Sequence, residues 1–393
     1  MLSKYLECYR QDLDACIAFW LQHSLDREYG GYFTALDRDG TVYDTKKYMW
    51  LQGREVWMFS RLYNEWERKQ EYLDAATLGL HFMRRYGRDE QGRIYFSLTR
   101  DGKPFFYQRK PYAAVFYMLG LLEYFKATGD ESCLQESVDL FWRIREWINN
   151  PSLMGRPVMA GQPPMSGLAD VMVLASMAIE LTQVQDDPRY RDVMREAIAG
   201  VRRHYDPERR ILVENVPLTP MDIHEWPETR MFIPGHSIEV AWFLLHILEN
   251  LPDIPADEQA AAQQLALVVI EGSLEYGWDK EFGGLYYYMD LGGFPSLKLE
   301  ADMKLWWPHT ETLYALVLAY SLTRQDRWLS WLERVHQYSY AHFADPEYGE
   351  WFGYCDRRGN LTHTCKGGNY KGCFHVPRFL LMTIQRLQQL QNG

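Results

Sequence analysis

The sequence lacks the short motifs by which many enzymes bind a nucleotide or a metal ion. It has no GxxxxGKS or GxxxxGKT loop, no GxGxxG after an expected strand and no HExxH pair. No apolar run approaches the roughly 18 residues that cross a bilayer, and the first residues, MLSKYLECYRQDLD, have no apolar core like that of a signal peptide. The six cysteines form no CxxC pair. These absences favour a cytoplasmic protein with free thiols and no membrane partner.

Basic residues are also scarce. The 393 residues include 42 Lys and Arg against 53 Asp and Glu, which gives a formal net charge of −11. A nucleic-acid-binding surface needs a basic face, so we expect no nucleic-acid partner.

Aromatic residues are abundant. Hydrophobic residues make up 47% and charged residues 24%, which is typical of a globular protein, but aromatics reach 15% with 14 Trp and 27 Tyr. Sugars stack their C–H faces on aromatic rings, while Trp and Tyr keep a polar group. The composition therefore indicates a large core, a sugar-binding cleft, or both.

One pattern recurs roughly every 60 residues, apart from one double interval. Acidic and glycine turn residues precede alternating apolar positions, which predicts short hairpins in REYGGYFTALDRDG (27–40), RDEQGRIYFSLTRDG (88–102), DPERRILVENV (206–216), WDKEFGGLYYYMDLGG (278–293) and DPEYGEWFGYCDRRG (345–359). A Pro/Gly-rich loop, NNPSLMGRPVMAGQPPMSG (149–167), lies in the double interval and could replace the missing hairpin.

Pairs of runs with helical apolar spacing lie between these hairpins. Two examples are residues 57–69 with 74–86 and residues 113–125 with 134–148. Six such pairs with insertions on one side predict an all-α fold, an (α/α)6 barrel of about twelve helices with short β-hairpin insertions at one end. Residues 1–393 would form this barrel as a single domain. An open α-solenoid is the structural alternative.

Polar residues recur where each expected inner helix begins. If all insertions lie at the same end of the barrel, these residues ring one pocket: Arg54, Tyr112, Asp170, His236 with Glu239, His309 with Glu311, and His375 with Arg378. Pro377 suits the first turn of a helix, so His375 and Arg378 lie at a helix start. We expect the aromatic lining to include Trp50, Trp57, Trp242, Trp306, Trp307 and Trp351.

Two histidines from different repeats are suited to moving a proton. A neutral imidazole at His236 or His375 can accept a proton, and an imidazolium opposite can return one. Glu239, three residues after His236, could orient that ring. An arginine fork at Arg54 could bind the oxygens of an enediolate formed when an aldose loses its α-proton. The simpler alternatives are two structural histidines and an ion pair between Arg54 and Glu55 or Asp44.

A metal site is a further alternative, because HxxE at 236–239 and HxE at 309–311 supply ligand types. The cysteines do not cluster with these histidines, and the proposed proton transfer requires no redox cofactor. We therefore expect neither a catalytic metal nor a required cofactor.

Several sequence blocks, in order along nearly the whole chain, resemble the N-acylglucosamine 2-epimerase family, which includes renin-binding protein. The blocks are GGYFTALDRDGTVYDTKKYMWLQGREVWMFSRLYN (30–64), VENV (213–216), PGHSIEVAWF (234–243), WDKEFGGLYYYMD (278–290), MKLWWPHTETL (303–313), DPEYGEWFGY (345–354) and KGGNYKGCFHVPR (366–378). The resemblance implies an (α/α)6 barrel that interconverts N-acetylglucosamine and N-acetylmannosamine by moving the C2 proton. A homodimer is compatible with it.

Site residues follow from matching these blocks. The resemblance implies that His236, His375, Arg54 and Glu239 are catalytic. It implies substrate-binding roles for Tyr48, Trp50, Glu214, Asn215, Trp307, His309, Glu311, Trp351 and Arg378, and the position of Tyr112 at an expected inner-helix start predicts the same role for that residue.

Two segments depart from the family pattern. RKPYAAVFY (109–117) replaces an IFSxCF-like segment, and MGRPVMAGQPPMSG (154–167) replaces a Gly/Lys-rich stretch linked to nucleotide binding. We therefore expect weak or no allosteric activation by ATP, and an N-acyl pocket that does not follow the family pattern. A related aldose 2-epimerase or aldose–ketose isomerase, of the mannose or cellobiose type, is the nearest alternative. More distant ones are a glycoside hydrolase using Glu239 and Glu311, and a non-enzymatic protein-binding role.

Overall fold

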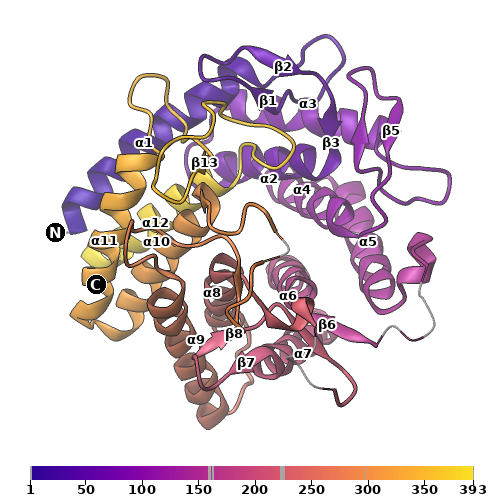
Figure 1. Cartoon of the computed structure of the whole chain (residues 1–393). Helices are drawn as coiled ribbons and strands as arrows, with labels where there is room; N and C mark the ends of the chain where they lie inside the picture. The colour runs from indigo at the N-terminus through magenta and orange to yellow at the C-terminus, as the bar shows by residue number, and fades with distance from the viewer. Residues whose placement is uncertain (1, 158–160, 162, 222–225, 297, 393) are drawn as a thin grey trace.

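Twelve α-helices form two concentric rings in the computed structural model, which describes residues 2–157, 161, 163–221, 226–296 and 298–392 (Figure 1). The inner ring consists of α2 (Met49–Glu65), α4 (Tyr112–Thr128), α6 (Leu168–Thr182), α8 (Pro234–Asn250), α10 (Trp306–Thr323) and α12 (His375–Asn392). The outer ring consists of α1 (Leu2–His23), α3 (Gln70–Tyr86), α5 (Glu131–Asn149), α7 (Pro188–His204), α9 (Ala256–Gly277) and α11 (Asp326–His342).

The two rings close on themselves. Each inner helix packs against the outer helix that follows it, and the last helix, α12, packs against the first, α1. This confirms the (α/α)6 barrel, and the contact between α1 and α12 distinguishes it from an open solenoid. No described helix combines the length and the apolar character needed to span a membrane.

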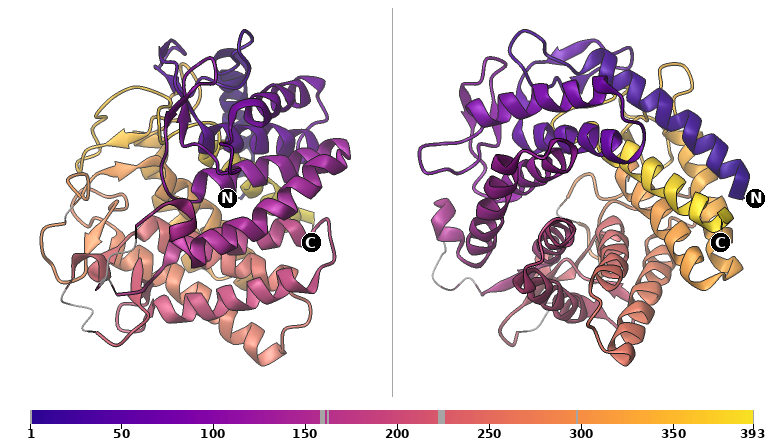
Figure 2. Two further views of the ribbon diagram at one scale, coloured as in Figure 1. Left: turned by 90° about the vertical axis from the view of Figure 1, so that its right-hand side faces the viewer. Right: turned by 180° about the vertical axis from the view of Figure 1, so that it is seen from behind.

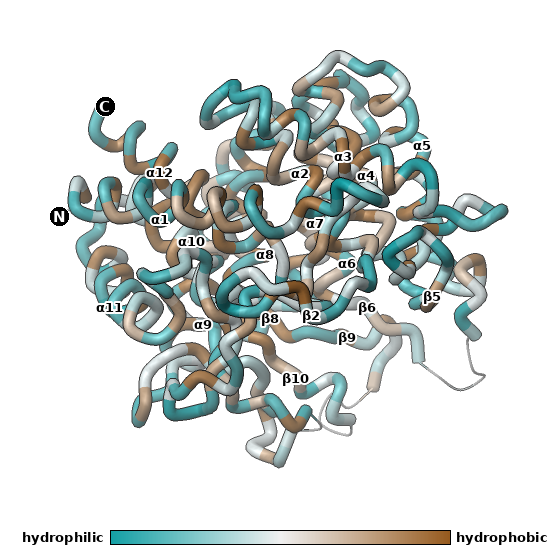
Figure 3. The backbone as a smooth tube through the Cα atoms, turned by 90° about the horizontal axis from the view of Figure 1, so that it is seen from above, coloured by the Kyte–Doolittle hydropathy of each residue, from teal (hydrophilic) through white to brown (hydrophobic). Residues whose placement is uncertain are grey.

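The sequence of each helix suits its ring. Inner helix α10 is buried without interruption from Trp306 to Ala319, as expected for a helix packed on all sides. Outer helix α7 is amphipathic and buries one face, which includes Tyr190 and Val201. Figure 3 shows hydrophobic stretches along the helices and hydrophilic ones in the surrounding loops.

Short antiparallel strands gather at one end of the barrel, as the left panel of Figure 2 shows. Three pairs form within an insertion: β1 (Ala35–Leu36) with β2 (Val42–Asp44), β4 (Ser97–Leu98) with β5 (Pro104–Phe106), and β7 (Tyr205–Asp206) with β8 (Ile211–Leu212). Strands β2 and β5 lie beyond the segments 27–40 and 88–102 in which the hairpins were predicted. The hairpins predicted at 278–293 and 345–359 are reduced to the isolated bridges Trp278 with Leu285 and Cys355 with Leu361.

Other strand pairs join neighbouring insertions. They are β3 (Lys47–Tyr48) with β4, β6 (Met165–Gly167) with β9 (Asn215–Pro217), β10 (Met231–Phe232) with β11 (Met289–Asp290), and β12 (Lys304–Leu305) with β13 (Tyr354–Cys355). The Pro/Gly-rich loop contributes η1 (Pro151–Met154) and β6, while its residues 158–160 and 162 lie outside the described residues. A second 3₁₀ turn, η2 (Pro227–Arg230), precedes β10.

A buried lysine–aspartate pair fixes three of the insertions. The Nζ to carboxylate distances are 2.8 Å for Lys47 with Asp26, 3.0 Å for Lys304 with Asp279, and 2.8 Å for Lys366 with Asp345. The three lysine side chains are fully buried. A buried cation needs such a partner, so these pairs tie the insertions to the barrel.

Candidate active site

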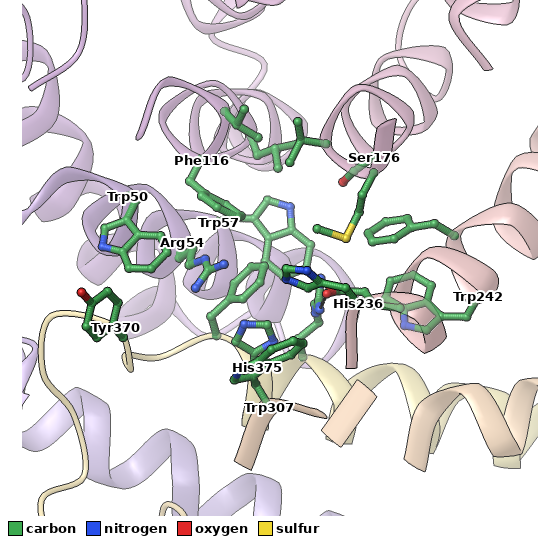
Figure 4. A pocket seen from close by; sticks show the side chains of 18 of the residues that line it. Trp50, Arg54, Trp57, Phe116, Ser176, His236, Trp242, Trp307, Tyr370 and His375 are labelled. Atoms are coloured by element: carbon green, nitrogen blue, oxygen red, sulfur yellow. Dashed lines mark hydrogen bonds and ion pairs between the residues drawn. The ribbon is translucent and has the colours of Figure 1, made fainter. Parts of the chain in front are cut away.

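A cavity of about 670 Å³ lies at the centre of the inner ring and is lined by residues from all six inner helices (Figure 4). Five of the six predicted tryptophans line it: Trp50, Trp57, Trp242, Trp306 and Trp307. Five inner helices, α2, α4, α6, α8 and α10, begin without a side-chain cap, so their first N–H groups are not satisfied by a capping side chain. The positive ends of the helix dipoles at these starts favour negative charge nearby.

Two histidine–carboxylate pairs face this cavity. Nδ1 of His236 lies 3.1 and 3.2 Å from the two carboxylate oxygens of Glu214, and Nδ1 of His375 lies 2.7 Å from Oε1 of Glu311. Because a carboxylate accepts the hydrogen bond, Nδ1 of each ring carries the proton and Nε2 is left to exchange protons with a bound molecule. Figure 4 shows both imidazoles projecting into the same space.

The surroundings of the two histidines shift their pKa values in opposite directions. Burial lowers the pKa of His375 well below its usual value, and the positive charges of Arg54 and Arg378 lower it further. Burial also opposes charging of His236, but the charge and hydrogen bond of Glu214 outweigh it and raise the pKa of His236. Two titratable groups with pKa values displaced in opposite directions make a base and an acid. This separation suits His375 to the role of a base and His236 to that of an acid.

Arg54 presents a buried cation to the cavity. Its guanidinium lies over the rings of Trp50, Phe116 and Phe374, at 4.8, 4.0 and 4.7 Å. Among the described residues no acceptor bonds its Nε and no carboxylate forms an ion pair with it. Burial, followed by the charge of Arg378, lowers the pKa of Arg54 to about 9. An unneutralised guanidinium of this kind is suited to binding an oxyanion.

The expected ion-pair alternative for Arg54 is wrong. Glu55 instead accepts a hydrogen bond from Ser24, and Asp44 pairs with Lys46 at 2.6 Å. Aromatic stacking rather than an acidic neighbour holds the arginine in place.

The expected partner of His236 also needs correction. Glu239 binds Nη2 of Arg378 at 2.8 Å, and Glu214 takes the place at His236 that the sequence suggested for Glu239. Glu214 lies in the insertion before α8, 22 residues from the histidine. The spacing of residues within one helix could not identify Glu214 as the partner of His236, although Glu214 belongs to the VENV block that resembles the family.

Arg378 joins two carboxylates on neighbouring helices. It lies 2.8 Å from Glu239 and 2.7 Å from Glu311, and the same Glu311 oxygen binds His375. Ligand atoms of Glu239, Glu311 and His375 lie within 4.8 Å of one another, which is a geometry that could hold a metal ion. Arg378 already occupies this carboxylate pair with a positive charge, so the residues favour an ion-pair network over a metal centre.

Seven of the ten predicted substrate-binding residues are not part of the cavity lining. Two of them, Glu214 and Glu311, instead bind the histidines that line it. The other five that the structure places elsewhere are Tyr48, Tyr112, Asn215, His309 and Trp351. His309 is buried with both ring nitrogens bonded to the backbone, at Leu285 and Leu305, which is a structural arrangement. Trp351 donates to Asp12 in the core, 2.8 Å away.

The remaining three of these residues, Tyr112, Asn215 and Tyr48, make local contacts. The Tyr112 hydroxyl donates to Asp170 at 3.0 Å, and the Asn215 side chain donates to the carbonyl of Glu228. Tyr48 packs edge-on against Phe96. We therefore propose no substrate-binding role for these three residues.

Several cavity residues were not predicted. At the deep end Arg61 lies near Glu123 and Glu180, and Lys126 also pairs with Glu180. Arg61 follows Arg54 by two helical turns, a spacing that could have indicated it. Near the insertions the lining includes Tyr287, Tyr288, Lys298, Glu300, Tyr354 and Tyr370.

An (α/α)6 barrel whose aromatic cavity holds two carboxylate-bound histidines and an arginine without a carboxylate partner among the described residues is suited to proton transfer on a carbohydrate. The chain belongs to the N-acylglucosamine 2-epimerase (GlcNAc 2-epimerase) family, whose sequence profile matches residues 31–376. It is 39% identical over 389 residues to the N-acylglucosamine 2-epimerase of Mus musculus, across 97% of this chain and 91% of that protein. The corresponding protein of Homo sapiens is 37% identical over 398 residues, across 99% of this chain and 91% of that protein.

Solved structures share the fold at lower identity. The cellobiose 2-epimerase of Bacillus thermoamylovorans B4167 gives a TM-score of 0.82 at 20% identity and covers 98% of this chain and 100% of its own. A D-mannose isomerase gives a TM-score of 0.79 at 18% identity, with 98% of each chain covered.

Proposed function

We propose that the protein interconverts N-acetyl-D-glucosamine and N-acetyl-D-mannosamine by removing the proton on C2 and returning it to the opposite face. The observation that carries this proposal is the pair of histidines whose Nδ1 atoms are held by Glu214 and Glu311 and whose pKa values are displaced in opposite directions. The identity of 37–39% to N-acylglucosamine 2-epimerases supports the choice of sugar.

The reaction starts from the open-chain aldehyde. In the direction where His375 is the base, its Nε2 takes the C2 proton, and Glu311 stabilises the imidazolium that forms. Negative charge then develops on the aldehyde oxygen at C1. The intermediate is an enolate rather than an enediolate, because C2 of this sugar carries nitrogen. Protonated His236 delivers a proton to the other face of C2, which inverts the configuration.

The two arginines have different tasks. Arg54 has no carboxylate partner among the described residues, so its guanidinium is available to the enolate oxygen, and a preorganised cation in a dry site stabilises that charge strongly. Arg378 is neutralised by Glu239 and Glu311 and fixes their positions. The reaction involves no net oxidation or reduction, so the proposed chemistry requires no redox cofactor.

Two other enzymatic functions lead to different products. A 2-epimerase or aldose–ketose isomerase for a 2-hydroxy aldose would use the same two histidines. A glycoside hydrolase needs two carboxylates on either side of a glycosidic bond, whereas Arg378 lies between Glu239 and Glu311 here.

The compartment is proposed from cysteine chemistry. All six cysteines are free, and Cys16, Cys133, Cys355 and Cys373 are buried. Free buried thiols fit a reducing compartment, so we propose a cytoplasmic location.

The test is to incubate the protein with N-acetyl-D-mannosamine in heavy water and follow the sugar by NMR. We expect N-acetyl-D-glucosamine to appear with deuterium at C2. Conversion of mannose or cellobiose with no turnover of either N-acetyl sugar would replace the proposed substrate, and loss of deuterium exchange with every aldose would overturn the reaction type.

A further inference from the structure

Two adjacent tyrosines form a hydrogen-bonded pair at the insertion side of the cavity. The Tyr288 hydroxyl donates to the Tyr287 hydroxyl at 3.2 Å, and the ring centroids are 4.0 Å apart. The backbone fixes both residues, because Tyr287 N–H bonds to Ala301 and Met303, and Tyr288 N–H bonds to Ala301. The pair belongs to the segment between α9 and α10, and both side chains line the cavity.

This tyrosine pair lies next to the two histidines. The Tyr287 ring packs edge-on against Trp307 at 6.2 Å, and the same indole packs against His236 at 5.1 Å and His375 at 6.0 Å. A sugar held with C2 between the imidazoles therefore has Tyr287 within reach of its neighbouring atoms.

The pair has a free donor at one end and a free acceptor at the other. Among the described residues neither hydroxyl makes another hydrogen bond, so the Tyr287 proton and a lone pair of Tyr288 are available to a bound molecule. Burial raises the pKa of both hydroxyls, and the charge of Glu300 adds to the effect. Both tyrosines stay protonated at neutral pH.

The proposed function requires the sugar ring to open, and no residue has yet been assigned to that step. Hexoses dissolve as rings, whereas C2 becomes acidic only when C1 is an aldehyde. Opening the ring requires a proton to leave the C1 hydroxyl oxygen, O1, and a proton to reach the ring oxygen, O5. At the deep end the polar groups are already engaged, since Arg61 and Lys126 pair with Glu180, and His246 bonds to Tyr314.

We propose that Tyr287 and Tyr288 open the sugar ring by relaying a proton, and that the protein therefore also interconverts the α and β anomers of its sugar. The O1 proton passes to the Tyr288 oxygen, Tyr288 passes its own proton to Tyr287, and Tyr287 passes its proton to O5. The C1–O5 bond breaks as C1 becomes a carbonyl. Both tyrosines end neutral with the hydrogen bond between them reversed, and the reverse relay, which restores it, closes the ring onto either face.

This inference rests on the proposed function for its substrate, but it does not need transfer of the C2 proton. The experiment starts from freshly dissolved crystalline N-acetyl-α-D-glucosamine in dilute buffer and follows the anomeric NMR signals, with C2 deuterium exchange measured in parallel. The proteins compared are the wild type, Tyr287→Phe, Tyr288→Phe, His375→Asn and the control Tyr348→Phe, which makes the same change at an exposed tyrosine outside the cavity.

We expect the wild type and the control to accelerate anomer interconversion over buffer. Tyr287→Phe and Tyr288→Phe each lose about a hundredfold of that acceleration, because a positioned proton donor typically contributes that much. His375→Asn loses C2 exchange yet still accelerates interconversion. Both Phe variants remove one hydroxyl without changing ring packing, and circular dichroism checks that they fold.

The inference is overturned if the two Phe variants interconvert anomers as fast as the control, or if His375→Asn loses interconversion together with C2 exchange. The second outcome would assign ring opening to the histidines. Failure of the proposed function looks different, because the wild type would then accelerate anomer interconversion without exchanging the C2 proton of either N-acetyl sugar.

Discussion

Nδ1 of His375 lies 2.7 Å from a carboxylate oxygen of Glu311, although 64 residues separate the two in the chain. The same oxygen binds Arg378 at 2.7 Å, so a single carboxylate orients the His375 ring and anchors the arginine one turn further along α12. Burial, and after it the charges of Arg54 and Arg378, lower the pKa of His375. In the proposed mechanism the Glu311 carboxylate stabilises the imidazolium that forms on proton transfer. These opposing effects suit His375 to the gain and loss of a proton that the proposed mechanism requires.

Replacing either histidine should stop the reaction without unfolding the barrel. We expect His236→Asn and His375→Asn each to lower kcat by about 10²- to 10⁴-fold, which is the usual contribution of a positioned acid or base. Steady-state conversion of N-acetyl-D-mannosamine measures the loss, and circular dichroism checks the fold. His309→Asn is the contrasting variant, since His309 is a buried structural residue whose replacement should lower stability. Near-normal turnover in His236→Asn would remove that residue from the mechanism.

Glu214 should act through His236. In the wild type Glu214 raises the pKa of His236, and activity that needs protonated His236 falls as pH rises through that raised value. In Glu214→Gln the charge is lost, the pKa of His236 drops, and the alkaline limb of the pH–rate profile should move to lower pH. Measuring kcat over a range of pH for the wild type and Glu214→Gln tests whether the alkaline limb moves. A uniform loss of activity at every pH, with the limb unmoved, would assign Glu214 a purely structural role.

Arg54 should stabilise the charge that develops on the substrate. We expect Arg54→Met to lower kcat by about 10²- to 10³-fold with a smaller change in KM, because an oxyanion-binding group acts mainly in the transition state. Arg54→Lys keeps a cation but loses the planar fork and the stacking over Phe116, so it should recover only part of the activity. A rise in KM with unchanged kcat would show that Arg54 only binds the substrate.

The barrel and the positions of its two histidines could be predicted from sequence because both depend on local patterns. Helical apolar spacing defines the runs at 57–69 and 113–125, and each insertion ends where a new inner helix starts. Contacts between irregular insertions have no such pattern. The pairing of β10 with β11 and the Glu214–His236 contact join segments whose separation in the chain carries no periodic signal.

The same limit explains the residues that were misplaced. His309 follows β12 just as His236 follows β10, but its ring nitrogens bond to Leu285 and Leu305 and fix the chain locally. Sequence gives the position of a side chain on a helix start. The backbone of neighbouring insertions decides whether that side chain reaches the cavity.

Acid should weaken the buried pair of Asp345 and Lys366. The nearby Arg38 and Lys366 hold the pKa of Asp345 well below its usual range, although burial opposes this. Stability from this carboxylate is therefore present above the pKa of the unfolded state and is lost as pH falls toward the folded value. Asp345→Asn should cost about 3–5 kcal/mol at pH 7, because it leaves buried Lys366 without its charged partner.

Chemical denaturation at several pH values measures that difference. The difference in the free energy of unfolding between the wild type and Asp345→Asn should become smaller as pH falls below about 4, the usual range of an aspartate pKa. Asp186→Asn, which changes an exposed ion pair with Arg191, is the control and should cost at most about 1 kcal/mol. A difference in the free energy of unfolding that does not vary with pH would contradict the claim that the charge of Asp345 stabilises the fold.

ATP should activate the enzyme weakly or not at all. A triphosphate carries several negative charges that need lysine, arginine or a helix N-terminus, and Arg156 is the only basic residue between Met154 and Gly167. The nearby Arg109 already donates to the carbonyl of Gly155, and Lys110 is the other basic group at the start of α4. We expect the rate of N-acetyl-D-mannosamine epimerisation to be the same with and without millimolar ATP. A several-fold rise would contradict this expectation, and its loss in Lys110→Ala but not in the exposed control Lys103→Ala would identify the phosphate-binding charge.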